Sequence, residues 1–149
     1  MEICDSLLNK AGSLTAEEMR IVQSHTLLGA KMLEGLEAYR EEEFVRVAYQ
    51  ICRWHHERYD GSGYPDHKKG EEIPIAAQVV GLADVYERLV SKPVDGKART
   101  HREAMQMILS GECGAFNPLL LDCLAETHEE IRKRVYEDSS VNNKIDGTD

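Results

Sequence analysis

Helical signals run along almost the whole chain and constrain its fold more than any other feature. Thr15 with Glu18, and Thr100 with Glu103, have the spacing of a capping box, in which a threonine and a glutamate together satisfy the start of a helix. Apolar residues recur at helical spacing after these starts, and Gly, Pro and charged residues separate the segments. No run of alternating β-branched residues bounded by turns is present. We therefore expect an all-α fold, a bundle of about five helices.

Each expected helix carries an apolar stripe. We assign Phe44 to the stripe of the helix at residues 42–59 and Val79 to the stripe of the helix at residues 74–90. One domain should cover residues 1–137, and the polar residues 138–149 should form a disordered tail. We place the helices at residues 15–36, 42–59, 74–90, 100–109 and 117–137, the last with Asn117 as its cap and Pro118 at its first position.

Composition excludes several classes of protein. The chain has 149 residues, which suits one domain, and a net charge of -9 argues against a protein that grips DNA or RNA over a broad basic face. Its apolar stretches are too short to span a membrane, and the first residues show no signal peptide. The four cysteines form no CxxC pair, so we interpret them as reduced thiols in a cytoplasmic protein.

The most unusual segment is HHERYDGSGYP, residues 55–65. Its adjacent histidines, His55 and His56, would point about 100° apart on a helix, so the two rings can serve two neighbouring metal ions. His55 lies one turn after Ile51 on an apolar stripe, where an imidazole needs a hydrogen-bond partner or a metal. The ordinary alternative is a histidine pair that favours the negative end of the helix dipole.

Two further polar residues lie among apolar neighbours on other expected helices. His25 is in register with Val22, and Gly29 one turn later allows another element to approach closely. Asp84 lies in GLADVYERL, where a carboxylate is costly to bury unless it is paired. A hydrogen-bonded core histidine and a solvent-facing acid are the ordinary alternatives. Together, the set looks like facing ligands in a bundle core and suits Mn, Fe or Zn: His25, His55, His56 and Asp84.

These segments resemble a known family. HHERYDGSGYP, followed by GEEIP and GLADVYERL, is similar to the HD-GYP branch of the HD-domain metal-dependent phosphohydrolases. LTAEEMRIVQSHTLLGAKML resembles the family segment just upstream, and GECGAFNPLLLDCL resembles the closing helix of the domain. The resemblance extends from about residue 4 to residue 135 and implies an HD-domain-like helical bundle.

The resemblance implies hydrolysis of the bacterial second messenger cyclic di-GMP, or binding of a related nucleotide, in signal transduction. Two or three divalent metal ions, usually iron or manganese, supply the charge neutralisation and the activated water that phosphodiester hydrolysis needs. By position, His25, His55, His56 and Asp84 match metal ligands. Residues of the signature loop, which shapes the rim of the site and is linked to contacts with signalling partners, match at Asp60, Gly61, Gly63, Tyr64 and Pro65.

Two of the chain's departures from the family pattern concern metal binding and phosphate binding. No His-Asp dipeptide occurs in the sequence, although the family carries one before the segment that matches CDSLLNKAGSLT. We therefore expect at least two of the family's metal ligands to be missing here and the metal site to be incomplete. After the third helix, Pro93 and Gly96 stand where the family has an arginine and a lysine that grip the substrate phosphates. The neighbouring Lys92 and Lys97 are the remaining candidates for phosphate binding.

Three hypotheses remain open from the sequence. The first is a cyclic di-GMP phosphodiesterase that is weak or inactive as this chain stands and holds fewer than two metal ions. The second is a catalytically degenerate signalling or binding module of the same fold, acting through nucleotide or protein contacts. The third is a general HD phosphohydrolase for another phosphate ester. We also expect self-association, since the remaining helices should expose part of the core.

Overall fold

The computed structural model describes residues 3, 7, 10, 12–91 and 98–142, with side chains up to residue 134. Helices and connecting turns make up these described residues, and no strand occurs among them, so the expected all-α class is confirmed. The chain divides into two compact units, Met1–Asp84 (unit 1) and Val85–Asp149 (unit 2). Helix α5 (Ile75–Ser91) contributes residues to both units.

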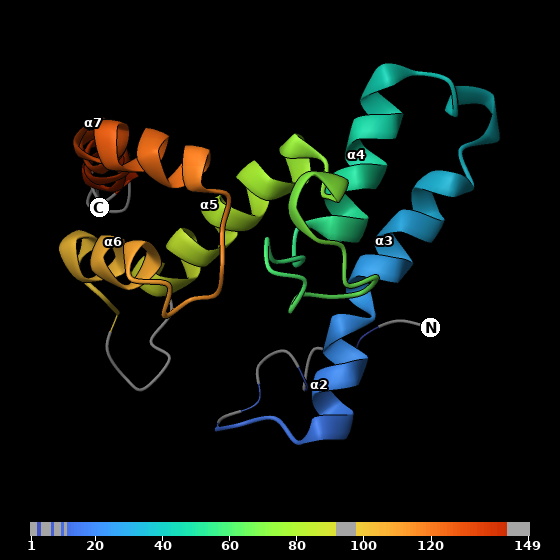
Figure 1. Ribbon diagram of the computed structural model, residues 1–149, viewed down its shortest axis with the longest axis horizontal. Coiled ribbons are helices and arrows are strands. Elements are labelled where there is room, and N and C mark those ends of the chain that lie inside the picture. The colour runs from blue at the N-terminus through green and yellow to red at the C-terminus, as the bar shows by residue number, and fades with distance from the viewer. Residues whose placement is uncertain (1–2, 4–6, 8–9, 11, 92–97, 143–149) are drawn as a thin grey trace, which may run out of the picture. The chain divides into compact units, whose positions relative to one another are not determined.

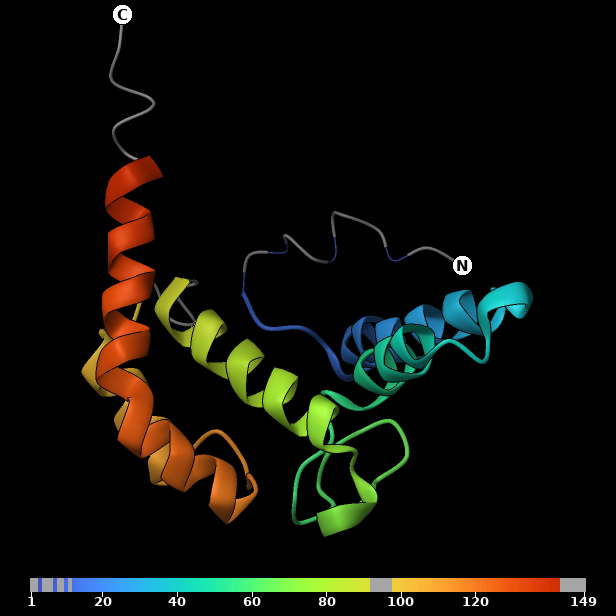
Figure 2. The same ribbon diagram turned by 90° about the horizontal axis from the view of Figure 1, so that it is seen from above.

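Unit 1 is built around a helical hairpin, which Figures 1 and 2 show in blue to teal. Helices α3 (His25–Glu34) and α4 (Glu43–Trp54) lie side by side and antiparallel, connected through the short 3₁₀ helix η1 (Glu37–Tyr39). Helix α2 (Ala16–Gln23) precedes α3, and the 3₁₀ helix η2 (Gly70–Glu72) lies in the loop before α5.

The predicted helix over residues 15–36 is divided into α2 and α3 at Ser24. Thr15 and Glu18 form the expected capping box at its start. Ser24 donates its hydroxyl to the carbonyl oxygen of Ile21 at 2.6 Å, and a serine that bonds the preceding turn competes with the helical hydrogen-bond ladder. The break makes His25 the first residue of α3.

Glycine allows α3 and α4 to approach closely, as the sequence predicted. A Cβ on Gly29 would lie 3.4 Å from both Cβ and Sγ of Cys52 in α4, which is van der Waals contact. The hairpin therefore has little room between its helices at this level. The close approach lies one turn after His25 on α3 and one turn before His55 at the end of α4.

In unit 2, α6 (His101–Leu109) packs against α7 (Pro118–Asn142), as Figure 1 shows. Both helix starts agree with the sequence prediction. Thr100 and Glu103 form a reciprocal capping box, and the Asn117 side chain accepts a hydrogen bond from the backbone N–H of Leu119 at 3.0 Å. Apolar side chains buried in this unit are Val85, Leu89, Ala104, Met105, Ile108 and Phe116.

Helix α7 is longer than predicted, because it ends at Asn142 rather than near residue 137. Ion pairs three and four residues apart stabilise its exposed face, as Glu129 with Arg132 and Glu130 with Arg134. A polar composition is thus compatible with a solvated helix as well as with a tail. Residues 143–149 lie outside the described residues, so a disordered tail there stays a prediction.

Two residues assigned to apolar faces are exposed, which corrects the sequence prediction. Phe44 in the first turn of α4 is 82% exposed, and Val79 in α5 is 48% exposed. Periodicity places a residue on a helix face but does not determine whether another element covers that face. Met32 in α3 is also 77% exposed, so the hairpin presents apolar side chains to solvent.

Two expectations from composition concern membranes and thiols. Within the described ranges, no helix combines the length and the apolar character needed to cross a membrane. No disulfide bond joins the three described cysteines, Cys52, Cys113 and Cys123. Cys4 lies outside the described residues.

Candidate metal centre

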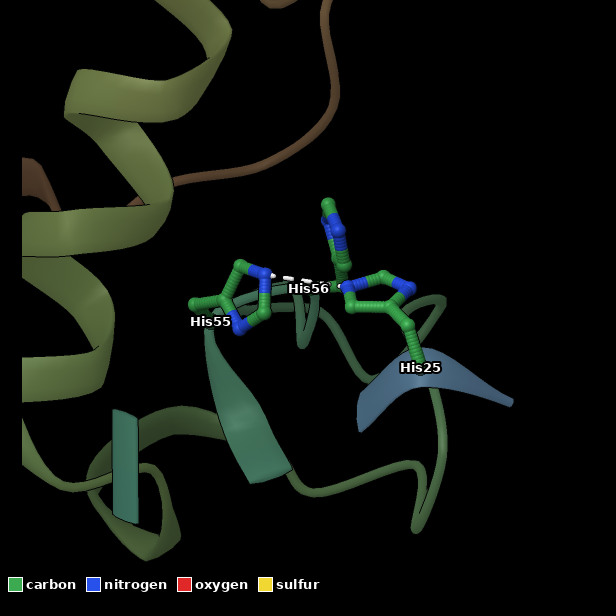
Figure 3. Close-up of side chains that lie close together, drawn as sticks. All are labelled: His25, His55 and His56. Atoms are coloured by element: carbon green, nitrogen blue, oxygen red, sulfur yellow. Dashed lines mark hydrogen bonds between the residues drawn. The ribbon is translucent and has the colours of Figure 1, made fainter. Parts of the chain in front are cut away.

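Three imidazoles converge in unit 1 where α3 begins and α4 ends (Figure 3). His25 is the first residue of α3, His55 is the C-cap of α4, and His56 follows it in the turn. One ring nitrogen from each residue lies within 4.8 Å of the others, and all three side chains are partly buried. We refer to these three residues as the imidazole cluster. Segments about 30 residues apart in the sequence thus bring three imidazole nitrogens close together.

The backbone determines which nitrogen of two rings faces the cluster. Nδ1 of His25 donates to the carbonyl oxygen of Val22 at 2.7 Å, and Nδ1 of His55 donates to that of Ile51 at 2.8 Å. Because a carbonyl oxygen only accepts, each neutral ring keeps its proton on Nδ1 and has a lone pair on Nε2. The two Nε2 atoms are 3.3 Å apart, the contact dashed in Figure 3. Two lone pairs at this distance need a proton or a cation between them.

This separation suits two ligands of one metal ion. Imidazole nitrogens bind transition metals at about 2.0–2.1 Å, so two of them on one ion lie roughly 3.0–3.4 Å apart. Burial lowers the pKa of His55, and the neighbouring His25 lowers it further, whereas the Ile51 carbonyl and the Asp84 carboxylate act in the opposite direction. The lowered pKa favours the neutral ring, which is the form that binds metals.

Asp84 lies on the face of α5 that meets the end of α4. A Cβ on Gly81 would clash with the carbonyl oxygen of His55, so α5 touches the α4 terminus at Gly81. Residues three apart share a helix face, which places Asp84 toward His55. Its Oδ2 atom is buried and has no hydrogen-bond partner within the described part of the chain. Asp84 is not in the group within 4.8 Å, so it lies farther out than the imidazoles.

These observations fit a divalent cation. A buried carboxylate oxygen without a partner is costly, and so are two facing lone pairs, unless a positive charge lies between them. Three imidazole nitrogens and a carboxylate form the mixed ligand set that suits Mn, Fe or Zn rather than Ca or Mg. The role of these four residues as metal ligands stays a prediction.

The signature loop, residues 60–65, determines where α4 ends. Helix α4 ends at Trp54, five residues before the predicted end, because the backbone just after Trp54 is hydrogen-bonded to the loop. The carbonyl oxygen of His56 accepts from the backbone N–H of Tyr64 at 3.3 Å, which replaces the continuing helical bond. The Tyr64 ring stacks on His56 with centroids 4.8 Å apart. The loop therefore orients one ring of the imidazole cluster.

Backbone conformation explains the other predicted signature residues. Gly61 has φ +85°, and a Cβ on Gly63 would clash with the backbone of residues 57–58, so glycine is required at both positions. Asp60 accepts from the backbone N–H and hydroxyl of Ser62, and these bonds lower the pKa of Asp60. The Tyr64–Pro65 peptide bond is cis. The remaining predicted site residues, Lys92 and Lys97, lie outside the described residues.

Sequence reasoning missed two residues that hold the loop. Glu57 is 5% exposed, and its carboxylate accepts from the backbone N–H groups of Asp66 at 2.7 Å and Lys68 at 3.1 Å. Asp66 accepts a two-point bond from Arg53 at 2.7 and 3.0 Å, and a bond from the Trp54 indole at 2.7 Å. Arg53 lowers the pKa of Asp66. The sequence feature that could have identified Glu57 is its position in HHERYDGSGYP, directly after the two histidines.

Replacing Glu57 by glutamine is expected to lower the free energy of unfolding by about 2 kcal/mol, since a buried amide –NH₂ would face a backbone N–H donor. Urea unfolding followed by fluorescence of Trp54, the only tryptophan, measures the change. Replacing exposed Glu71 by glutamine, whose amide oxygen can still accept the bond from the Tyr59 hydroxyl, is the matched control and should change stability by about 0.5 kcal/mol or less. Equal values for the two variants would contradict a role of Glu57 in holding the loop.

Comparison with known proteins decides the family. Residues 2–116 match a family model described as HD domain. The chain belongs to the HD domain family. The matched region contains the imidazole cluster, the signature loop and Asp84, so the family assignment includes every residue of the candidate site.

Curated proteins that resemble this HD domain have names that describe cyclic dinucleotide phosphodiesterases. A probable cyclic di-GMP phosphodiesterase of Vibrio cholerae is 39% identical over 122 residues, 80% of this chain and 28% of that protein. A cyclic di-GMP phosphodiesterase response regulator of Xanthomonas campestris is 36% identical over 131 residues, 88% of this chain and 34% of that protein. A 3'3'-cGAMP-specific phosphodiesterase of Vibrio cholerae is 33% identical over 129 residues, 87% of this chain and 24% of that protein.

These relatives confirm the resemblance to cyclic di-GMP phosphodiesterases of the HD-GYP type that the signature loop indicated. This HD domain spans only about a quarter to a third of the length of these relatives. The activity, substrate and partners of this chain are therefore proposals.

Proposed function

We propose that this HD domain binds a divalent metal ion, manganese or iron, through His25, His55, His56 and Asp84, and acts on a cyclic dinucleotide. The convergence of three imidazoles on one point carries the proposal, together with the unpartnered oxygen of Asp84. Cyclic di-GMP is the proposed ligand, since the names of two relatives give that substrate. An ion bound there would supply charge neutralisation on a phosphate and an activated water.

The residues around the cluster have positioning roles in this proposal. The bonds from His25 and His55 to backbone carbonyls hold both rings with Nε2 toward the centre. Tyr64 holds His56 by stacking. A pocket of about 360 Å³ beside the cluster is lined by α2 and the signature loop, with Arg20 and His67 as its basic side chains. These side chains favour an anionic ligand next to the metal.

The candidate ligands among the described residues, and two replaced residues after α5, support weak or absent catalysis. The four candidate ligands suit one ion, whereas clamping both the attacking and the leaving oxygen of a phosphodiester takes two ions about 3.5–4 Å apart. Pro93 and Gly96 stand where the family grips phosphate with arginine and lysine, and neither can donate a charged hydrogen bond. We therefore propose slow hydrolysis at most.

A signalling or binding module without catalysis is the second candidate function. The intact and well-bonded signature loop favours it, because Glu57 and Asp66 hold the loop although the phosphate-gripping residues are replaced. Such a module would bind cyclic di-GMP or a signalling protein at the loop.

Exposed Met32 and Phe44 support the predicted self-association of the chain. Sedimentation velocity over a concentration series measures it. A monomer at every concentration would contradict this prediction.

Incubation of the Mn²⁺-loaded chain with cyclic di-GMP, and separately with 3'3'-cGAMP, tests the two functions. Chromatography detects the linear dinucleotide, and equilibrium dialysis detects binding without cleavage. We expect slow cleavage that requires the metal and is abolished in His55→Asn. Binding without any linear product would establish the module instead. Failure to bind either nucleotide, or equal cleavage by the parent and His55→Asn, would contradict a cyclic dinucleotide site at the cluster.

A further inference from the structure

Unit 2 contains a second group of metal-type ligands that the sequence analysis did not single out. His101 is the first residue of α6, and His128 and Glu129 lie on α7. One ligand atom from each lies within 4.8 Å of the others. His101 is buried with 6% of its surface exposed, whereas His128 is half-buried and Glu129 exposed. We refer to these three residues as the second cluster.

A short chain of polar contacts orients the second cluster. The Tyr86 hydroxyl lies 2.8 Å from Nδ1 of His101, and Nε2 of His101 lies 3.1 Å from Nδ1 of His128. The two imidazole rings are stacked, with centroids 5.3 Å apart and planes 20° apart. An oxygen of Glu129 lies 3.7 Å from Nδ1 of His128. Three potential ligand atoms, Nε2, Nδ1 and a carboxylate oxygen, therefore lie around one point.

Tyr86 gives His101 the surroundings of a metal-binding histidine. A hydroxyl oxygen can accept the proton of Nδ1, which leaves the lone pair on Nε2 toward His128. A partner that holds the far ring nitrogen is the usual support of an imidazole ligand, since it fixes both tautomer and ring orientation. The buried ring is thus held in place before any ion binds.

We propose that Nε2 of His101, Nδ1 of His128 and the carboxylate of Glu129 bind a divalent transition metal ion, best matched by Zn²⁺. With metal–ligand bonds of about 2.0–2.2 Å, ligand atoms on one ion lie roughly 3–4 Å apart, which agrees with the separations of 3.1 and 3.7 Å. Two imidazoles and one carboxylate are a set that leaves a coordination position open.

The surroundings leave that open position accessible. The second cluster lines an open pocket of about 540 Å³, together with Thr100, Arg102, Met105 and Arg132. Arg132 forms an ion pair with Oε2 of Glu129 at 2.8 Å. The other carboxylate oxygen, Oε1, faces Nδ1 of His128. The two arginines reduce affinity for a bare cation but favour a small anion as an additional ligand of the ion. We therefore expect binding of moderate strength rather than a closed structural site.

Zinc titration of the full chain, followed by ¹H–¹⁵N spectra of the imidazole nitrogens, tests the second cluster separately from the imidazole cluster. Resonances of His101 and His128 are assigned by comparison with His128→Gln. We expect Zn²⁺ to shift Nε2 of His101 and Nδ1 of His128, with affinity lowered about tenfold or more in Glu129→Gln. Glu130→Gln is the matched control, because it removes the same charge one residue away and breaks only the exposed pair with Arg134.

The result is independent of the proposed function, because the resonances of His25, His55 and His56 report on the other unit. Glu129→Gln and Glu130→Gln both replace exposed residues, so these two variants should keep the helical circular dichroism of the parent. No shift at either nitrogen at millimolar Zn²⁺ would overturn the proposal and establish a hydrogen-bonded histidine pair instead. Equal affinity in Glu129→Gln and Glu130→Gln would overturn the assignment of Glu129 as a ligand.

Discussion

Replacing His55 by asparagine is expected to weaken Mn²⁺ binding at the imidazole cluster by about a hundredfold, the upper end of what even a supporting residue of a metal site costs when it is lost. The asparagine amide can take over the bond that Nδ1 makes to the carbonyl oxygen of Ile51, so the local backbone is kept. Only the Nε2 ligand is lost. Equilibrium dialysis with elemental analysis measures the affinity, in chains that also carry Glu129→Gln to weaken the second cluster.

The matched control for this prediction is His67→Asn. His67 is exposed in the loop before η2, and asparagine tolerates its positive φ of 55°. This variant removes one histidine from the same unit without touching the imidazole cluster, so Mn²⁺ affinity should stay within about twofold of the parent. Equal weakening in both variants would mean that the ion binds through scattered surface histidines rather than at the cluster.

Replacing Gly81 by alanine is expected to lower the free energy of unfolding of unit 1 by about 3 kcal/mol, the upper part of the range for overpacking. The added Cβ would clash with the carbonyl oxygen of His55, and a backbone atom cannot rotate away as a side chain can. The clash would move α5 from the end of α4, and Asp84 with it. Urea unfolding followed by Trp54 fluorescence measures the stability, and Mn²⁺ affinity should fall in the same variant.

Gly29→Ala is the matched control for Gly81→Ala. Its Cβ would lie 3.4 Å from Cys52, at ordinary contact distance, and alanine favours a helix by about 1 kcal/mol over glycine. We expect the stability of this variant to lie within about 1 kcal/mol of the parent. Full stability of Gly81→Ala would contradict the close packing of α5 on His55.

Local rules predicted the helix starts well and the ends less well. The capping boxes at Thr15 and Thr100, and the cap at Asn117, depend on residues within one turn, so a sequence contains them completely. The end of α4 depends on the bond between His56 and Tyr64, which a loop forms eight residues later. Periodicity continued the helix because no local residue before Gly61 stops it.

The two histidine clusters differed in how visible they were in the sequence. Register with Val22 and Ile51 pointed His25 and His55 inward, and a long motif surrounded His55. His101 lies on the same helix face as the buried residues three, four and seven positions later, which is the signal that could have located it. Its partner His128 lies 27 residues away on an exposed stretch of α7, and no spacing rule connects the two.

X-ray absorption at the manganese edge tests most directly whether His25, His55 and His56 share one ion. The Mn²⁺-loaded chain carrying Glu129→Gln should show scattering from three imidazole rings together with oxygen ligands. The spectrum should change to two rings when His55→Asn is added. A first shell of oxygen atoms alone, or the same spectrum with and without His55, would contradict metal binding by the imidazole cluster.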